Sequence, residues 1–390
     1  MSVSFFTILK RYSSTLVALT LAFFVAVSFY GRQRIEGASV TITADGRTVL
    51  IRSDTPISMP NISAKSAAVI ECSSGEIVFS KNENERLPMA STTKIMTAIT
   101  VIETSDLSAR VTVPKEACGI EGSSVYLREG EVFTVEELLY ALMLASANDA
   151  ATALALHTCG SIEAFADKMN EKAASLGLTD THFTNPHGLN DSEHYTTAKE
   201  LAIISAYASQ NEDFRRICST KKTIIRRDSK ESARLLTNHN KMLTLYEGAF
   251  GVKTGFTKAS GRCLVSGAER DGLSFIAVTL CAPDDWNDHR ALLDLAFSSY
   301  EKKTLLSKSE LTLSLPLAGG LQSSVLCTNA EEISVIVPKG TCSFEQVLEI
   351  KRFEFAPVER GERVGRIIFR YKGKAIAQSS IVTVYCAKER

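Results

Sequence analysis

The chain has 390 residues, which at about 150 residues per domain suggests two or three domains. Its content of 45% apolar and 23% charged residues suits a protein with a large core and excludes a disordered or collagen-like polymer. The 44 basic residues balance the 44 acidic ones, so charge gives no argument for binding nucleic acid or for a polybasic membrane surface.

The N-terminus contains a long uncharged segment. Residues 12–31 form 20 such positions, rich in Leu, Val and Phe and preceded by Lys10 and Arg11. This length suits a helix that crosses a bilayer, while the small residues at 26–28 also suit signal-peptide cleavage. We therefore predict that residues 1–31 are a signal peptide or a membrane anchor, and cleavage stays open. Either alternative places the protein outside the cytoplasm, secreted or anchored to the outer face of the membrane; a buried core helix is the remaining interpretation.

The next segment, residues 32–60, is rich in Ser, Thr, Asp and Pro and is expected to be an exposed linker. From Ala67 onward the pattern becomes regular, and residues 61–303 are expected to form one domain. Apolar runs, capping residues and a turn at 271–272 predict its elements. These are a hairpin over 67–79, helices beginning near 90, 134, 161 and 197, a hairpin over 263–280 and a helix over 285–302.

Residues 304–390 differ in character, because alternating apolar residues at 311–315 and apolar runs at 333–337, 364–371 and 376–385 replace the helical pattern. This alternation predicts a small all-β domain, which we interpret as a sandwich.

Cysteine and histidine usage gives little support for a metal site. The nine cysteines are dispersed without a Cys-x-x-Cys pair, so we interpret them chiefly as small apolar residues. Their odd number leaves at least one without a partner in the chain. None of the six histidines forms His-Glu-x-x-His, which argues against a zinc carboxypeptidase. We therefore expect no metal and no cofactor.

Three short motifs point to chemistry: Ser-Thr-Thr-Lys at 91–94, Ser-Ala-Asn at 146–148 and Lys-Thr-Gly at 253–255. The first two are weak alone, since Ser219 and Ser299 also begin Ser-x-x-Lys and Ser209 also begins Ser-x-Asn. Context separates them from these decoys. Three residues apart at a helix start, Ser and Lys share one face, and the positive helix end favours an oxyanion.

A serine hydroxyl is a poor nucleophile without a base beside it. Lys94 can serve Ser91 as that base if burial and a second cation lower its pKa, and Lys253 is the candidate for that cation. Ser146 and Asn148 lie between two predicted helices, where they can hydrogen-bond Lys94 or a substrate. The alternative is that Asn148 and Asp149 merely cap the next helix. The Lys-Thr-Gly motif suits a strand edge that binds a carboxylate, or a simple turn.

In order and surroundings, these motifs resemble those of the serine-type D-alanyl-D-alanine carboxypeptidases, the low-molecular-mass penicillin-binding proteins of peptidase family S11. The resemblance implies an α/β (α+β) serine penicillin-recognising, β-lactamase/transpeptidase-like domain followed by a C-terminal β-sandwich. It spans most of residues 67–300. The matching stretches are Leu87–Ala98, Gly122–Leu127, Ala145–Ala151, Thr184–Leu189 and Gly251–Thr257.

Carried over residue by residue, the resemblance implies a role for each motif position. Ser91 would be the acylated nucleophile and Lys94 the general base, with Ser146 and Asn148 as proton relay and amide clamp. The other positions would bind substrate. The terminal carboxylate would be held by Lys253 and Thr254 beside Gly255, the oxyanion by the N–H groups of Ser91 and Phe256, and His239 falls where some relatives carry a basic residue.

The implied activity is removal of the terminal D-alanine from peptidoglycan stem pentapeptides, with acylation of the same serine by β-lactams.

Two departures from the family pattern are Ala147, where many relatives have Gly, and a final segment, residues 381–390, that looks like a strand rather than an amphipathic helix. Membrane contact is then expected through residues 12–31. The alternatives are a β-lactamase and a catalytically silent cell-wall-binding protein of the same fold.

Overall fold

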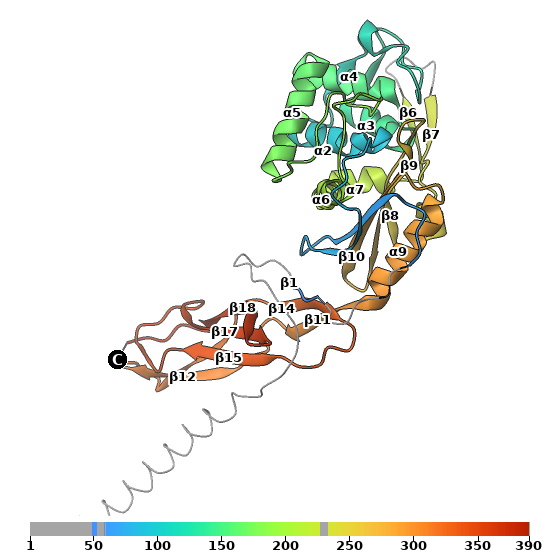
Figure 1. The fold of residues 1–390 in the computed structure, drawn as a ribbon. Helices are drawn as coiled ribbons and strands as arrows, with labels where there is room; N and C mark the ends of the chain where they lie inside the picture. Colours follow the sequence, from blue (N-terminus) through green and yellow to red (C-terminus); the bar gives the residue numbers. More distant parts are fainter. Residues whose placement is uncertain (1–48, 53–57, 59, 227–232, 390) are drawn as a thin grey trace, which may run out of the picture. The chain divides into compact units, whose positions relative to one another are not determined.

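The computed structural model describes residues 49–52, 58, 60–226 and 233–389. The chain forms two compact units, one over Ile57–Glu301 and one that joins Lys302–Arg390 to an N-terminal segment. Figure 1 shows the described elements of both units along the chain. The predicted signal or anchor over residues 1–31 lies outside the described residues. Within the described part of the chain, no helix is both long and apolar enough to cross a membrane.

The first unit is built on a five-stranded antiparallel sheet with strand order β3-β2-β10-β9-β8 (Figure 1). Both predicted hairpins are confirmed, as β2 pairs with β3 and β9 with β10. The pairing of β2 with β10 joins the two ends of this unit, and it leaves β8 at one edge. The strands are β2 (Ser66–Glu71), β3 (Ile77–Lys81), β8 (Ala249–Thr257), β9 (Gly261–Arg270) and β10 (Leu273–Leu280).

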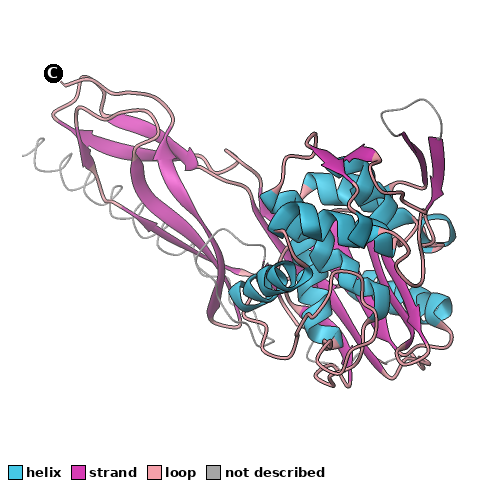
Figure 2. Cartoon of the chain, turned by 90° about the horizontal axis from the view of Figure 1, so that it is seen from above, coloured by secondary structure: helices cyan, strands magenta, loops and turns pink. Residues whose placement is uncertain are grey.

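The helices of the first unit lie mostly between β3 and β8 in sequence, and all of the described helices belong to this unit (Figure 2). Helix α6 packs on β2 and β10, and α9 packs on β9 and β10. The helical segments are η1 (Ala90–Thr93), α2 (Lys94–Thr104), η2 (Lys115–Ala117), α3 (Val135–Leu144), α4 (Asn148–Cys159), α5 (Ile162–Ser175), α6 (Ala198–Ser209), α7 (Glu212–Ser219), α8 (Met242–Leu245) and α9 (Asp285–Ser299).

The predicted helix starts are confirmed by their capping hydrogen bonds. Thr134 forms a capping box with Glu137 at the start of α3, and the side chains of Ser161 and Thr197 accept backbone N–H groups at the starts of α5 and α6. Each bond satisfies a donor that the first helical turn leaves without a partner. Gly177 follows α5 with φ +74°, as expected for a glycine that ends a helix.

The predicted helix over 285–302 runs too far. Helix α9 ends at Ser299, and the chain continues directly as strand β11 (Tyr300–Leu306) of the other sheet system. Tyr300 is buried and its ring approaches Phe275, so packing of this aromatic ring favours extended backbone over another helical turn.

The second unit contains two sheets and confirms the all-β domain. A six-stranded sheet has the order β15-β17-β18-β13-β12-β16, and a three-stranded sheet has the order β1-β14-β11. Apolar residues of both sheets share one core, for example Ile51 and Val335 with Val325 and Phe369. The remaining strands of this unit are β12 (Leu313–Ala318), β13 (Ser324–Asn329), β14 (Ile333–Pro338), β15 (Glu345–Ile350), β16 (Glu354–Phe355), β17 (Arg363–Tyr371) and β18 (Lys374–Thr383).

The expected linker over 32–60 contains structure. Val49–Leu50 forms β1, which pairs in parallel with β14, and the Ile51 N–H donates to the Ile336 carbonyl at 2.8 Å. This short apolar run is buried, so removing it from water stabilises a strand where composition suggested an exposed segment. The boundary between the two units lies between Glu301 and Lys302, whereas the sequence analysis expected it after residue 303.

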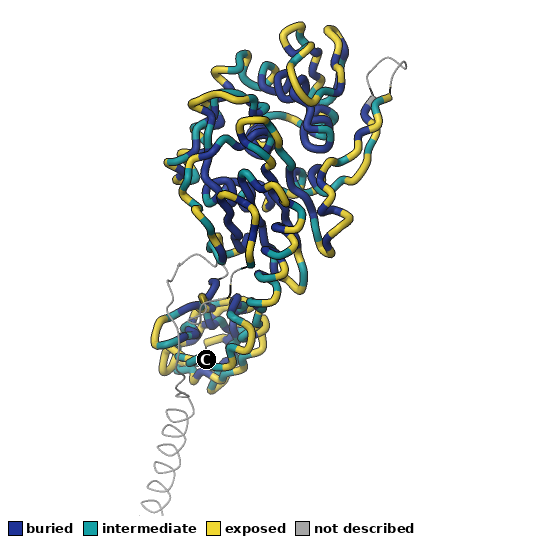
Figure 3. The backbone as a smooth tube through the Cα atoms, turned by 45° about the vertical axis from the view of Figure 1, so that its right-hand side comes forward, coloured by how far each residue is buried: buried dark blue, intermediate teal, exposed yellow. Residues whose placement is uncertain are grey.

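Two small hairpin-like sheets complete the first unit: β4 (Arg110–Thr112) with β5 (Val132–Thr134), and β6 (Lys222–Arg226) with β7 (Ala233–Thr237). Its core joins the helices to the central sheet, as the dark-blue segments in Figure 3 show. Within this core lie two lysines, Lys94 and Lys253, among the largest fully buried side chains. Because burying an ammonium is costly unless it is paired or neutral, these lysines mark the candidate site.

Candidate active site

Ser91 lies in η1, a single 3₁₀ turn that leads directly into α2 at Lys94. The predicted helix start near Ala90 is therefore confirmed, with a tighter first turn. Ala90 has φ +47°, a left-handed conformation that costs a residue with a Cβ about 1–2 kcal/mol. Such strain is often found where a protein fixes a functional group, and here it immediately precedes the serine.

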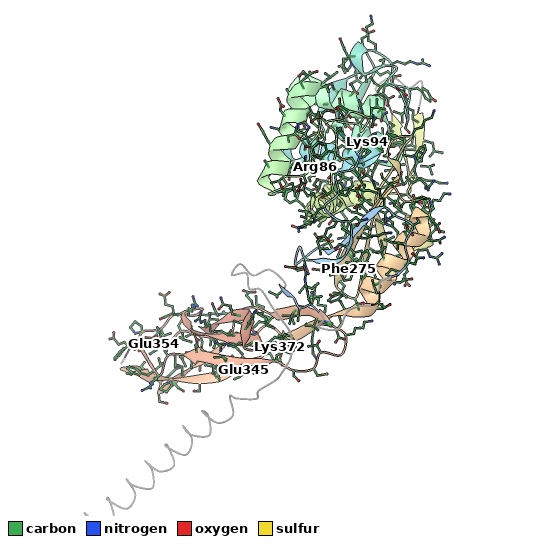
Figure 4. The ribbon with its side chains drawn as sticks, viewed as in Figure 1. Arg86, Lys94, Phe275, Glu345, Glu354 and Lys372 are labelled. Carbon is green, nitrogen blue, oxygen red and sulfur yellow. The ribbon has the colours of Figure 1, made fainter. Side chains whose placement is uncertain are left out.

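The amine of Lys94 contacts the serine of its own motif, the Ser-Ala-Asn motif and the 184–189 segment. Its Nζ donates to Ser91 Oγ at 2.9 Å, to Asn148 Oδ1 at 2.7 Å and to the His187 carbonyl at 2.7 Å. An ammonium group can donate all three of these hydrogen bonds, whereas in the neutral amine the bond with Ser91 reverses and the Ser91 O–H donates to Nζ. The Lys94 label in Figure 4 lies among the helices of the first unit. A buried amine is thus held against the serine hydroxyl, as the residue spacing predicted.

Burial lowers the pKa of Lys94 well below its ordinary value of 10.5, the nearby Lys253 lowers it further, and Asp149 raises it. The order of these causes fits the predicted mechanism of activation, in which desolvation and a second cation both disfavour the charged amine. A neutral Lys94 can accept the proton of Ser91, which a permanently charged ammonium cannot do.

The Ser-Ala-Asn motif lies between α3 and α4, as predicted. Ser146 is buried and has φ +58°. Asn148 begins α4, and its side chain binds Lys94 through Oδ1 and the Glu121 carbonyl through Nδ2, the latter at 2.5 Å. The N-cap of α4 is Ala147, without a side-chain cap. The alternative interpretation, in which Asn148 caps the helix, is therefore wrong.

Asp149, next to this motif, anchors the loop over residues 121–127. Its buried carboxylate accepts hydrogen bonds from Ser124 Oγ at 2.6 Å and from the Leu127 and Val125 N–H groups at 2.9 and 3.3 Å. From the sequence, Asp149 was given only the alternative role of capping the next helix together with Asn148. Its position directly after the motif was the available signal.

The Lys-Thr-Gly motif lies on the edge strand β8, which confirms the strand over the simple turn. A Cβ on Gly255 would lie 3.0 Å from the Ser91 nitrogen, so only glycine lets β8 approach η1 this closely. Lys253 is buried, and its Nζ donates to the Thr254 carbonyl at 3.0 Å. Burial lowers the pKa of Lys253 to about 7, so a modest gain in negative charge nearby would keep it protonated.

Phe256 and His239 are the two remaining residues that the sequence assigned to substrate binding. The Phe256 side chain is 66% exposed, and it shares a strand face with Thr254 because side chains alternate along β8. Burial and, to a smaller extent, Lys253 lower the pKa of His239. The His239 backbone N–H donates to the Leu144 carbonyl. The predicted contacts of Phe256, Thr254 and His239 with substrate stay predictions.

The segment over residues 184–189 is a part of the site that the sequence reasoning left without a role. The His187 carbonyl accepts from Lys94, the Pro186 carbonyl accepts from Thr97 Oγ1 at 2.6 Å, and Gly188 lies against the Ala90 carbonyl. Backbone carbonyls hold the base here, and no side-chain pattern reveals such a contact. The asparagine, proline and glycine of this turn were the only signal.

The decoy motifs lie elsewhere. Ser219, Ser299 and Ser209 are the last residues of α7, α9 and α6, where the helix dipole opposes a developing negative charge. In the described part of the chain, no group of three or more His, Cys, Asp or Glu side chains could hold a metal ion. All nine cysteines are free, and four are buried as predicted, whereas Cys342 and Cys386 are exposed.

The serine hydroxyl is bonded to a buried lysine, and a second buried lysine lies on the adjacent edge strand of an antiparallel sheet beside a helical lobe. This arrangement is that of serine acyl-transferring hydrolases that use a lysine base. Family comparison makes the assignment specific. Residues 53–284 match the model of the D-alanyl-D-alanine carboxypeptidase family, peptidase S11, and residues 300–390 match that of the penicillin-binding protein 5 C-terminal domain. The chain belongs to this family of serine-type carboxypeptidases.

Individual relatives agree in both sequence and fold. The chain is 34% identical to D-alanyl-D-alanine carboxypeptidase DacF of Bacillus subtilis, over 82% of this chain and 84% of the relative. Penicillin-binding protein 5 of Haemophilus influenzae superposes with a TM-score of 0.65 at 26% identity, covering 86% of this chain and all of that structure. The D-alanyl-D-alanine carboxypeptidase of Streptomyces K15 is 33% identical over 64% of this chain and 93% of its own length.

Proposed function

We propose that this protein removes the terminal D-alanine from peptidoglycan stem pentapeptides through an acyl-enzyme on Ser91. The contact between Ser91 Oγ and the buried Lys94 Nζ, itself held by Asn148, carries the proposal. Neutral Lys94 takes the hydroxyl proton as Oγ attacks the carbonyl between the two D-alanines. Collapse of the tetrahedral intermediate breaks the peptide bond, and the amine of D-alanine leaves with a proton. Water then hydrolyses the ester and frees Ser91.

The terminal carboxylate of the peptide determines how the substrate is positioned. Lys253 and Thr254 bind the terminal carboxylate, whose negative charge restores the protonated form of Lys253. The N–H groups of Ser91 and Phe256 bind the oxyanion that forms during attack, because Ser91 lies at the start of the helical segment and Gly255 brings β8 close to it. Ser146 relays the proton between Lys94 and the leaving amine, and His239 adds a basic group beside the carboxylate.

The same serine is expected to react with β-lactams, whose strained amide carbonyl and carboxylate match the reacting groups of the D-alanyl-D-alanine end. Peptidoglycan lies outside the cytoplasmic membrane, so the proposed substrate also requires export. We therefore propose that residues 1–31 direct the protein across the membrane and either anchor it through residues 12–31 or are cleaved.

The test is D-alanine release from a model stem pentapeptide, together with the mass of the intact protein after incubation with benzylpenicillin. We expect release of D-alanine and one added penicillin on the peptide that contains Ser91. Ser91→Ala should abolish both. Ser299→Ala is the matched control, because Ser299 also begins a Ser-x-x-Lys motif and lies at the end of α9; it should behave as the wild type.

Two other outcomes would favour the alternatives. Rapid turnover of a chromogenic cephalosporin would favour a β-lactamase, which needs a carboxylate to activate water against the acyl-enzyme. Here the 184–189 segment holds no acidic residue, and its His187 carbonyl accepts from Lys94. D-alanine release that is absent in the wild type, or unchanged in Ser91→Ala, would refute the enzymatic proposal and leave a cell-wall-binding protein.

A further inference from the structure

A buried histidine lies at the end of the loop that holds the base, and the proposed reaction leaves it without a role. The backbones of His182 and Tyr195 bond each other in both directions, at 2.9 and 3.1 Å, and so close the loop over residues 183–194. His194 is the last residue of this loop and is only 3% exposed. Its ring meets the Phe183 ring edge-on, with centroids 5.7 Å apart. A polar ring in such surroundings needs hydrogen-bond partners for both of its nitrogens.

The two nitrogens of His194 have different partners, which fixes the position of the ring proton. The Thr184 N–H donates to Nδ1 at 3.0 Å, so Nδ1 is an acceptor and carries no hydrogen. Burial lowers the pKa of His194 to about 4, so the ring is neutral at physiological pH and its one proton lies on Nε2. Nε2 therefore donates to Thr93 Oγ1, which lies 2.8 Å away and is also buried.

The hydroxyl of Thr93 connects the ring to the residue before the nucleophile. Its O–H donates to the Ala90 carbonyl at 2.8 Å, and Ala90 has the left-handed φ of +47°. This carbonyl shares a peptide plane with the Ser91 N–H, and in a trans peptide the two groups point in opposite directions. The bonds that hold the carbonyl consequently set the direction of the Ser91 N–H, the group proposed to bind the oxyanion. A donor on the carbonyl also polarises the peptide, which strengthens its N–H as a donor.

We propose that His194 is a positioning residue for the reaction: through Thr93 it holds the peptide before the nucleophile so that the Ser91 N–H is aimed at the developing oxyanion. This inference rests on the proposed function. The same loop holds the base through a backbone carbonyl, so one segment positions both reacting groups. Because an oxyanion forms only in the transition states of acylation and hydrolysis, loss of the His194 bond should lower kcat and leave KM nearly unchanged.

Two substitutions separate the roles of the two ring nitrogens. Asparagine places its amide near the position of Nδ1, so His194→Asn keeps an acceptor for the Thr184 N–H and loses the donor to Thr93. Glutamine places its amide near the position of Nε2, so His194→Gln keeps that donor. We expect His194→Asn to lower kcat for D-alanine release from the model pentapeptide by about tenfold, the worth of one buried hydrogen bond, and to change KM by less than about twofold. His194→Gln should restore most of the lost kcat.

Thr93→Val removes the hydroxyl that links the ring to the peptide. If His194 acts through this hydroxyl, the double variant His194→Asn/Thr93→Val should lose no more kcat than Thr93→Val alone. The matched control is His289→Asn. His289 is buried in α9 and its Nε2 lies 2.9 Å from Thr279 Oγ1, but neither residue belongs to a motif of the site. This control should lose stability in urea and keep the wild-type kcat.

Each kcat is expressed per active site, counted by stoichiometric labelling with benzylpenicillin, so that loss of folded protein does not count as loss of activity. An unchanged kcat in His194→Asn, a loss that His194→Gln does not recover, or independent losses in the double variant overturns the inference. A wild-type protein that is acylated but releases no D-alanine overturns the proposed function. The acylation rates of the same variants then decide the role of His194 by the same criteria.

Discussion

Replacing Gly188 by alanine tests whether the 184–189 segment positions the reacting groups. An added Cβ would lie 1.9 Å from the Ala90 carbonyl oxygen and 2.8 Å from Thr93 Oγ1, and the φ of Gly188 is +85°. The left-handed backbone costs alanine about 1–2 kcal/mol, and relief of the overlap adds about 1–3 kcal/mol. The free energy of unfolding should therefore fall by about 2–5 kcal/mol.

The effect on activity should be larger than the effect on stability. Ala90 precedes Ser91, and the His187 carbonyl, one residue before Gly188, accepts from Lys94. Movement of this segment consequently displaces both the nucleophile and the base, and a displacement of about 1 Å can cost about 100-fold in rate. Acylation by benzylpenicillin and D-alanine release measure the loss, and urea unfolding measures stability.

The matched control is Gly75→Ala. Gly75 has a similar φ of +71°, but an added Cβ would meet no atom within 4 Å. This variant should lose only the backbone contribution of about 1–2 kcal/mol and keep its activity. If Gly188→Ala acylates as fast as Gly75→Ala, the close packing of the 184–189 segment does not position Ser91 and Lys94, and our reasoning about the segment is wrong.

Three further predictions follow from buried groups. The kcat/KM for D-alanine release should rise with pH as Lys94 loses its proton, and it should fall as the pH passes about 7, where Lys253 loses its proton. Lys253→Arg should move the alkaline limb of this profile to higher pH. An alkaline limb that does not move would contradict the assignment to Lys253. Asp149→Ala leaves several donors of the 121–127 loop without an acceptor, so it should destabilise the protein by about 2–4 kcal/mol and slow acylation. Unchanged unfolding in urea would show that Asp149 does not anchor this loop. Ile51→Ala should lower the stability of the C-terminal unit by about 2–4 kcal/mol without changing D-alanine release, and an unaltered thermal transition would show that β1 contributes little.

Local chemistry explains why many sequence predictions succeed. Helix starts at Thr134, Ser161 and Thr197 depend on side-chain bonds that span three residues, so a short pattern contains all the required information. The contact between Ser91 and Lys94 is equally local, because three residues along a helical segment bring their side chains to one face. The end of α9 and the strand β1 were missed because their conformations depend on packing partners distant in sequence.

The amino-acid sequence by itself determined the family, the two-domain organisation and the identity of the reactive side chains, since each is encoded in short segments of fixed order. Only the tertiary structure decided how these segments meet: that Asn148 binds Lys94 instead of capping α4, that a backbone carbonyl at His187 holds the base, and that Gly255 lies against Ser91. Such contacts depend on burial and on the pairing of remote strands. These contacts form because the packing of the whole core lowers the free energy, and no short stretch of sequence specifies that total free energy.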